Sequence, residues 1–328
     1  MKNVLEYLEN INNDNKVIDK NGSITYKDLQ VVSKKIGSGL AKYVKNNDPV
    51  PVYMEKGISC LEVFMGSLYA GGFYSLLNAG LPKMRLEQII NVLDVDYVVT
   101  DNEHLESAKE FFPDKELILY EDLIDSEIDD ELLSNIRARK LDVDPVYANF
   151  TSGSTGVPKG VVVGNRSIID FIDNFTSTFG INETDIIANQ APFDFDVSVK
   201  DIYPALKTGA TLVIVPKELF SRPAELIDFL VEHKVTTMTW AVSALCLIST
   251  FHGLDYKVPE TVKRVMFSGE VMPMKHLKEW MKHLPNATFV NLYGPTEITC
   301  NCTYHIIDRN REYEKIPVGI PFNNEDVF

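Results

Sequence analysis

The strongest constraint on the fold is the alternation of short β-branched runs with amphipathic helical stretches between residues 17 and 120. Val50–Tyr53, Asp96–Thr100 and Glu116–Tyr120 have the residue types of strands, whereas Ile58–Ala70 has the pattern of a helix. Strands that alternate with helices of this length form parallel sheets joined by crossover helices. The sequence therefore predicts an α/β fold.

A helix is also expected after Ile24–Tyr26, where Thr25 and Asp28 can cap its start and apolar residues recur to about Val44. The acidic residues from Glu121 to Glu131 predict a solvated surface segment.

A second series of units runs from Tyr147 to about Val290, with a strand expected at Thr211–Val215 and a helix at Ala224–Val231. The chain of 328 residues is 45% hydrophobic, which is enough for a sizeable core. We find no internal repeat and no low-complexity linker. We therefore expect two packed sheet-and-helix subdomains, residues 1–145 and 146–328.

Charge and composition exclude several function classes. The 32 basic and 47 acidic residues give a net charge of −15, which provides no attraction to nucleic acid or to an anionic membrane. No apolar stretch reaches the ~20 residues of a membrane helix, and the start lacks the apolar core of a signal peptide. Four cysteines are too few for a disulfide framework. We expect a cytoplasmic protein with no nucleic-acid partner and no membrane insertion.

One glycine-rich segment, TSGSTGVPKG at Thr151–Gly160, follows the predicted strand Tyr147–Phe150. Its three glycines and four hydroxyl residues expose donors that can surround phosphate oxygens, and Lys159 adds a cation. Pro158 stands where a Walker A loop needs its last glycine, so an ordinary P-loop NTPase is excluded. The alternative is a flexible Gly/Ser turn.

TSGSTGVPKG resembles the phosphate-loop motif of the adenylate-forming superfamily, which includes acyl-CoA synthetases, luciferases and the adenylation domains of nonribosomal peptide synthetases. NLYGPTE at Asn291–Glu297 resembles a second motif of that superfamily, and FSGE at Phe267–Glu270 resembles a strand end and loop that lie near the adenine and the substrate. The structural alternative for the Asn291–Glu297 motif is a Gly-Pro turn with a surface glutamate. The structural alternative for Phe267–Glu270 is a strand that ends in a turn.

The resemblance implies ATP and Mg²⁺ as cofactors. Tyr293 offers an aromatic face to adenine, Thr296 a hydroxyl to the α-phosphate and Glu297 an oxygen ligand to Mg²⁺. Catalytic roles fall on Thr151, Lys159, Thr296 and Glu297. The predicted nucleotide-binding residues are Thr151, Ser152, Gly153, Ser154, Thr155, Gly156, Lys159, Gly269, Glu270, Asn291, Leu292, Tyr293, Gly294, Pro295 and Thr296.

APFDFDVSV at Ala191–Val199 resembles the FDxSV motif of the superfamily members that activate amino acids. In those members the aspartate equivalent to Asp196 pairs with the substrate α-ammonium. A site for a fatty tail would have no reason to hold an unpaired carboxylate in an apolar pocket. The alternative is that Asp196, or Asp194, caps the helix expected over Val199–Leu206.

Over most of its length the chain is most similar to the ligases that charge a carrier protein with D-alanine, as in NQAPFDFDVSVKDIYPALKTGATL, FSGEVMP and NLYGPTEIT. This resemblance implies activation of a small amino acid as its adenylate and transfer to the phosphopantetheine thiol of a carrier protein. A monomer is the default expectation, since the sequence carries no signal for an oligomer. The alternatives are an adenylation domain for another polar amino acid, an acyl- or aryl-CoA synthetase, and an inactive nucleotide-binding module.

Two positions depart from those ligases, which have a methionine at Lys200 and a cysteine at Ser268. Lys200 could accept a carboxylate or hydroxyl of a larger polar amino acid, or could point outward and solvate its helix. The segment Trp240–Ser243 lacks the proline usual there. The substrate residues implied by the resemblance are Asp196, Val197, Lys200, Thr239, Met266, Ser268, Leu292, Cys300 and Asn301.

Cys300 and Cys302 are expected to be neighbours on a strand, with Cys300 facing the pocket and Cys302 facing away. His305 alone cannot complete a metal site with them, and no G-x-S-x-G elbow occurs. None of the six histidines is assigned to catalysis. The ribose-binding TGD-like segment and the C-terminal lid of the superfamily are not found before Phe328, so we expect a truncated large N-terminal domain that adenylates poorly alone.

Overall fold

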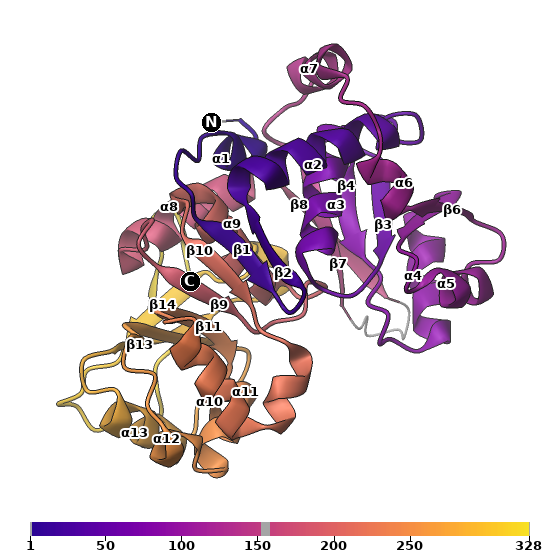
Figure 1. Ribbon diagram of the computed structural model, residues 1–328. Coiled ribbons are helices and arrows are strands. Elements are labelled where there is room, and N and C mark those ends of the chain that lie inside the picture. Colours follow the sequence, from indigo (N-terminus) through magenta and orange to yellow (C-terminus); the bar gives the residue numbers. More distant parts are fainter. Residues whose placement is uncertain (1, 152–157, 328) are drawn as a thin grey trace. The chain divides into compact units, whose positions relative to one another are not determined.

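The structure, a computed structural model, describes residues 2–151 and 158–327 and has two sheets with accompanying helices (Figure 1). The expected α/β class is confirmed. The chain divides into two compact units. The first unit comprises Met1–Asp14, Ile24–Phe171 and Phe193–Phe195, and the second comprises Asn15–Ser23, Ile172–Pro192 and Asp196–Phe328.

The first unit is built on a six-stranded sheet of order β6-β5-β3-β4-β7-β8, in which every described pairing is parallel except β7 with β8. Its elements are α1 (Leu5–Glu9), α2 (Tyr26–Leu40), β3 (Pro49–Tyr53), α3 (Ile58–Tyr69), β4 (Phe73–Leu76), α4 (Lys83–Leu93), β5 (Tyr97–Thr100), α5 (Leu105–Phe111), β6 (Glu116–Leu119), α6 (Tyr120–Ile124), α7 (Asp130–Ala138), β7 (Pro145–Thr151), β8 (Lys159–Gly164) and the start of α8 (Asn165–Phe179).

Local signals explain several of these elements. The Thr25 side chain accepts the backbone N–H of Asp28 at 3.1 Å, so the predicted cap of α2 is confirmed. α2 ends at Leu40 rather than near Val44, and the residues after it form a turn in which the N–H groups of Tyr43 and Val44 both donate to the Leu40 carbonyl. Val44 is nevertheless buried, which explains why the apolar pattern continues beyond the helix.

The second unit is built on a nine-stranded sheet of order β15-β14-β13-β12-β11-β9-β10-β1-β2. Its elements are β1 (Lys16–Asp19), β2 (Gly22–Thr25), the end of α8, β9 (Ile186–Asn189), η1 (Asp196–Ser198), α9 (Val199–Thr208), β10 (Thr211–Ile214), η2 (Lys217–Ser221), α10 (Pro223–Glu232), β11 (Thr237–Ala241), α11 (Val242–Thr250), α12 (Gly253–Tyr256), β12 (Arg264–Ser268), α13 (Met274–His283), β13 (Thr288–Tyr293), η3 (Thr296–Ile298), β14 (Thr303–Ile306) and β15 (Ile320–Pro321).

Parallel pairing runs from β1 through β10, β9, β11 and β12 to β13, and β14 and β15 add antiparallel strands at one edge. The apolar sides of α10, α11 and α13 pack on this sheet around the fully buried Trp240 and Trp280. The indole N–H of Trp240 donates to the Ala188 carbonyl at 2.8 Å, and that of Trp280 donates to the Leu245 carbonyl at 3.0 Å. Both tryptophans of the chain therefore lie in the core of the second unit.

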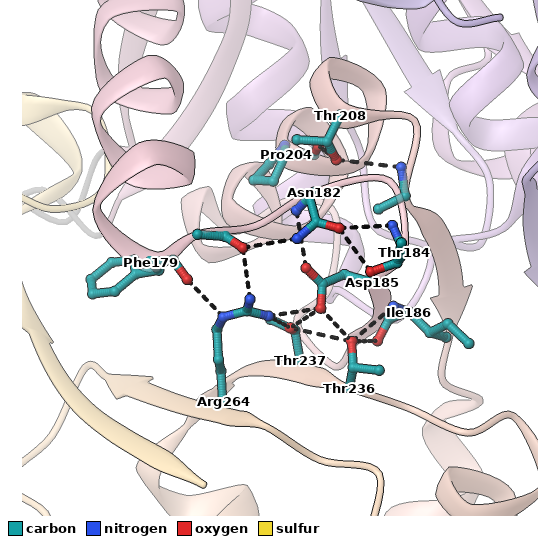
Figure 2. Close-up of polar contacts among 12 residues, drawn as sticks. Phe179, Asn182, Thr184, Asp185, Ile186, Pro204, Thr208, Thr236, Thr237 and Arg264 are labelled. Carbon is teal, nitrogen blue, oxygen red and sulfur yellow. Dashed lines mark hydrogen bonds and ion pairs between the residues drawn. The ribbon is translucent and has the colours of Figure 1, made fainter. Parts of the chain in front are cut away.

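A buried ion pair lies where β9, β11 and β12 begin (Figure 2). The Arg264 guanidinium donates to Asp185 Oδ1 at 2.7 Å, and the Thr236 hydroxyl donates to the same oxygen at 2.7 Å. The backbone N–H of Asn182 donates to the other carboxylate oxygen at 3.0 Å. Ligands of open α/β sheets bind at the opposite, carboxyl ends of the strands. We therefore interpret this network as structural.

Candidate functional site

The carboxyl ends of the parallel strands in the second unit bring several predicted substrate residues together. Thr239 on β11 pairs with Met266 on β12, and Ser268 ends β12. Leu292 lies near the end of the neighbouring β13. All four side chains are buried. The Thr239 hydroxyl has no hydrogen-bond partner among the described residues. This edge is where sheets of this kind bind ligands.

Lys200 on α9 is almost completely buried, with 1% of its surface exposed. Its ammonium donates to Ser268 Oγ at 3.1 Å and to Asn301 Oδ1 at 2.6 Å. The alternative in which Lys200 solvates the surface of its helix is therefore wrong. Lys200, Ser268 and Asn301 thus form one hydrogen-bonded cluster of predicted substrate residues. They come from α9, β12 and the segment after η3.

The surroundings of Lys200 shift the pKa of its ammonium in two opposite directions. Burial lowers the pKa of the Lys200 ammonium below the ordinary lysine value, because the charged form loses hydration. Electrostatic interactions with Cys300, Asp196 and Asp201 raise the pKa of Lys200 and so act in the opposite direction. The buried Asp201 accepts a hydrogen bond from Asn189 Nδ2 at 2.9 Å. The sequence pattern gave no signal for this Asn189–Asp201 pair beside the lysine.

Asp196 begins η1 and is half-buried, as is Val197 beside it. The N-cap of α9 is Ser198, which makes no side-chain capping bond, so neither Asp196 nor Asp194 is the cap of that helix. Asp194 instead accepts a hydrogen bond from Asn78 Nδ2 at 3.0 Å within the first unit. The main-chain carbonyl of Asp196 accepts the Cys300 thiol at 2.8 Å.

The expectation that Cys300 and Cys302 are neighbours on a strand is wrong. Both precede β14, and Thr299 and Cys300 have positive φ values of 63° and 76°, which no strand accommodates. The two thiols still have different partners, since Cys302 Sγ donates to the Tyr293 carbonyl at 3.6 Å. This turn, rather than a strand, brings Cys300 to Asp196.

The turn after β13 packs closely against the segment that carries Asn301. A Cβ added at Gly294 would lie 2.4 Å from Asn301 Cα and 2.8 Å from the Cys300 carbonyl oxygen, so only glycine fits. The N–H of Cys302 donates to the Tyr293 carbonyl at 2.9 Å. Tyr293, Pro295 and Glu297 are exposed, and Thr296 is half-buried. The Asn291 side chain donates to the Pro317 carbonyl at 2.8 Å.

The loop after β12 begins at Gly269, which has a φ of 92° in the left-handed region that favours glycine. Gly269 and Glu270 are both exposed. The side chain of Glu270 is therefore available to a ligand, but its predicted role stays a prediction.

The glycine-rich segment joins β7 to β8 in the first unit, and these strands form an antiparallel pair in which Thr151 lies opposite Lys159. Lys159 is exposed. Arg85 on α4 donates to the Thr151 carbonyl at 3.1 Å, a contact that the sequence did not signal. The predicted phosphate-binding residues Ser152, Gly153, Ser154, Thr155 and Gly156 lie outside the described residues.

Within residues 2–151 and 158–327, one group of side chains has the arrangement of a metal site, and it does not include Glu297. The ligand atoms of Asp255, Glu279 and His283 lie within 4.8 Å of one another. His283 Nε2 lies 3.2 Å from Asp255 and 2.9 Å from Glu279, a contact pattern that ion pairing alone explains. Glu297 as a Mg²⁺ ligand stays a prediction.

Comparison with known proteins identifies related sequences across most of the chain. The sequence profile of the AMP-binding enzyme family matches residues 8–328. A D-alanine–D-alanyl carrier protein ligase of Bacillus velezensis is 32% identical over 316 residues, covering 93% of this chain and 61% of that protein. The ligase of Lacticaseibacillus casei is 29% identical and is covered to 60%. The chain thus spans about 60% of the length of these curated relatives.

Solved structures share the fold. The nonribosomal peptide synthetase FmoA3 superposes with a TM-score of 0.87 at 24% identity, covering 98% of this chain and 34% of that one. The N-terminal subdomain of Klebsiella oxytoca NpsA, in complex with 3-hydroxybenzoyl-AMSN, superposes with a TM-score of 0.79 at 19% identity and is covered to 81%. No helix in the described part of the chain has the length and apolar character to cross a bilayer.

Proposed function

We propose that this chain, which belongs to the AMP-binding enzyme family, binds Mg²⁺-ATP and an amino acid and takes part in forming the aminoacyl-adenylate. In the whole protein the activated amino acid would pass to the phosphopantetheine thiol of a carrier protein. The single observation that carries the proposal is the family match over residues 8–328. The carrier-protein step is supported by the curated relatives, which are named as ligases of a D-alanyl carrier protein.

The nucleotide contacts are assigned by the chemistry of the side chains. Thr151 and Lys159 supply a hydroxyl and a cation for phosphate oxygens, and the exposed ring of Tyr293 supplies a face for adenine. The exposed carboxylate of Glu297 is a hard oxygen ligand of the kind that Mg²⁺ prefers. Bound Mg²⁺ would neutralise charge that develops on the phosphates as pyrophosphate leaves.

The amino-acid contacts are assigned to the second unit. Asp196 would pair with the α-ammonium, and the buried cluster of Lys200, Ser268 and Asn301 would contact the side chain. An amino acid, rather than a fatty or aryl acid, is favoured because these ionic and polar groups are costly to bury against an apolar tail. Positioning of the carboxylate against the α-phosphate then does most of the catalytic work.

Mg²⁺-ATP should protect the 328-residue chain against thermal unfolding, because a ligand that binds only the native state stabilises it. At a nucleotide concentration of about 100 times Kd the expected gain is about 2.7 kcal/mol. The measurement is a thermal melt with ATP and Mg²⁺, with Mg²⁺ alone, and with ATP in chelator. An unchanged melting temperature at saturating nucleotide would refute the proposed function.

Lys159→Ala should weaken this protection, since an ionic hydrogen bond to phosphate contributes about 1.5–3 kcal/mol. Lys109 provides a matched control in the same unit, because it is exposed and its one ion pair among the described residues is with Glu106, three residues away on the surface of α5. Lys109→Ala should leave the shift with nucleotide unchanged. Equal shifts in both variants would remove Lys159 from the nucleotide site.

A further inference from the structure

Lys200 holds its side-chain nitrogen in the interior of the second unit, where none of the described residues forms an ion pair with it. The atoms that Nζ contacts, Ser268 Oγ at 3.1 Å and Asn301 Oδ1 at 2.6 Å, both belong to neutral side chains. Among residues 2–151 and 158–327, no carboxylate forms an ion pair with Nζ. Lysines are almost never fully buried unless they are paired, because an isolated buried charge is costly. An anionic ligand group placed against Nζ would favour the charged form of Lys200 and form an ion pair with it.

The groups around Lys200 also suit an anion. An ammonium has three donor hydrogens, and two of them are used by Ser268 and Asn301. Ser268 accepts from Lys200 and so retains its hydroxyl hydrogen, and Asn301 accepts through Oδ1 and so retains its amide N–H groups. Ammonium, hydroxyl and amide donors are thus gathered at one buried place. A carboxylate, which only accepts hydrogen bonds when ionised, is complementary to such a set.

Charge counting distinguishes between classes of amino acid. In the proposed function, Asp196 pairs with the α-ammonium and the α-carboxylate is the group that reacts with ATP. A substrate with an apolar side chain would then leave Lys200 without a carboxylate in contact, because Asp196 is engaged by the α-ammonium and Asp201, which accepts from Asn189 Nδ2, forms no ion pair with Nζ. A substrate with a side-chain carboxylate would instead supply an anion that can contact Nζ directly.

We propose that the activated substrate is an amino acid with a side-chain carboxylate, of the aspartate or glutamate kind, and that Lys200 binds this carboxylate with Ser268 and Asn301. The inference rests on the proposed function, because it takes the amino-acid site as given. It departs from the alanine named for the curated relatives. The positions of the donors make Lys200 the specificity-determining residue of the site.

The test is binding of nonhydrolysable aminoacyl-sulfamoyl adenosines to the 328-residue chain by calorimetry. The aspartyl and glutamyl compounds are compared with the asparaginyl, glutaminyl and alanyl compounds, which all share the adenosine part. We expect one acidic compound to bind more tightly than its own amide by at least about tenfold, since a buried charge pair contributes more than a neutral hydrogen bond. Its Kd should also be lower than that of the alanyl compound.

Lys200→Met should reverse this order, with the acidic compound weakened by at least about 100-fold, because its carboxylate would be buried without a partner. The alanyl compound should then bind more tightly than it does to the wild type. Lys207→Met is the matched control on the same helix, because Lys207 pairs with Asp173 at 2.6 Å and is 26% exposed. This variant should keep the wild-type order.

Asn301→Asp tests the same idea with Lys200 retained, so that a folding defect in Lys200→Met would not prevent a decision. An aspartate at this position would place a carboxylate where Oδ1 now accepts from Nζ at 2.6 Å. This internal anion should abolish the preference for acidic compounds. A wild-type preference for the alanyl or amide compounds, or an acidic preference that survives both substitutions, would overturn the inference while the adenylation proposal stands. Failure of every compound to bind would instead refute the proposed function itself.

Discussion

Replacement of Asp196 by alanine in the full-length protein should abolish amino-acid-dependent ATP–pyrophosphate exchange. The carboxylate is proposed to pair with the substrate α-ammonium, and removal of one member of a desolvated ion pair costs about 3–5 kcal/mol. That cost corresponds to a loss of roughly 10²–10⁴-fold in kcat/KM for the amino acid. The measurement is the exchange rate as a function of amino-acid concentration, which gives kcat/KM for the amino acid. The KM for ATP should change little.

Asp194 offers a matched control two residues away. It lies in the same short segment and carries the same charge, but it accepts a hydrogen bond from Asn78 in the first unit. Asp194→Asn and Asp196→Asn each replace a carboxylate by a neutral amide of nearly the same size. We expect a large loss only for Asp196→Asn. Exchange that is unaffected by the change at position 196, or equally reduced by both changes, would refute the ammonium anchor.

The features that the sequence predicted well are those encoded by neighbouring residues. β3, α3, β5, β6, β10 and α10 begin and end within one or two residues of the expected positions, because apolar periodicity and β-branching act locally. The Thr25 cap of α2 belongs to the same class, since its two partners are three residues apart. The α/β class follows from the order of such elements along the chain.

The features that the sequence did not predict depend on partners that are distant in the chain. Lys200 is buried because it contacts Ser268 and Asn301, which lie 68 and 101 residues further along. A lysine on an isolated helix would instead be expected at the surface. β1 belongs to the second unit because it pairs with β10, almost 200 residues later, and no local pattern encodes that pairing.

The turn at Thr299 and Cys300 shows a different reason why a local structure could not be predicted from the sequence. Neither residue type favours the left-handed region, so the residue types at these positions do not indicate a turn, and the expectation of a strand at Cys300 and Cys302 is wrong. The close approach of Gly294 to the backbone of Asn301 requires the chain to turn there. The position of Cys300 beside Asp196 therefore depends on a contact between two backbones, which side-chain patterns do not reveal.

The buried pair of Asp185 and Arg264 carries the largest expected effect on stability. Asp185→Asn should destabilise the second unit by about 3 kcal/mol, because the Arg264 charge would lose its partner in a largely buried place. Asp228→Asn is the control, because Asp228 makes an ion pair of the same 2.7 Å length with Lys257 on the surface. Exposed pairs contribute about 0–1 kcal/mol. Urea unfolding followed by tryptophan fluorescence measures this unit selectively, because Trp240 and Trp280 both lie in its core.

The difference between wild type and Asp185→Asn should depend on pH in a predictable direction. Burial alone would raise the pKa of Asp185, but hydrogen bonds from Asn182, Thr236 and Arg264 outweigh it, and the folded pKa lies below the ordinary value. A carboxylate with a depressed folded pKa stabilises the fold fully above its unfolded pKa of about 3.9. That stabilisation is lost as the pH falls through the folded pKa. The free energies of unfolding should therefore differ most near neutral pH and converge in acid, and a gap that widens below about pH 4 would contradict the assigned charge state.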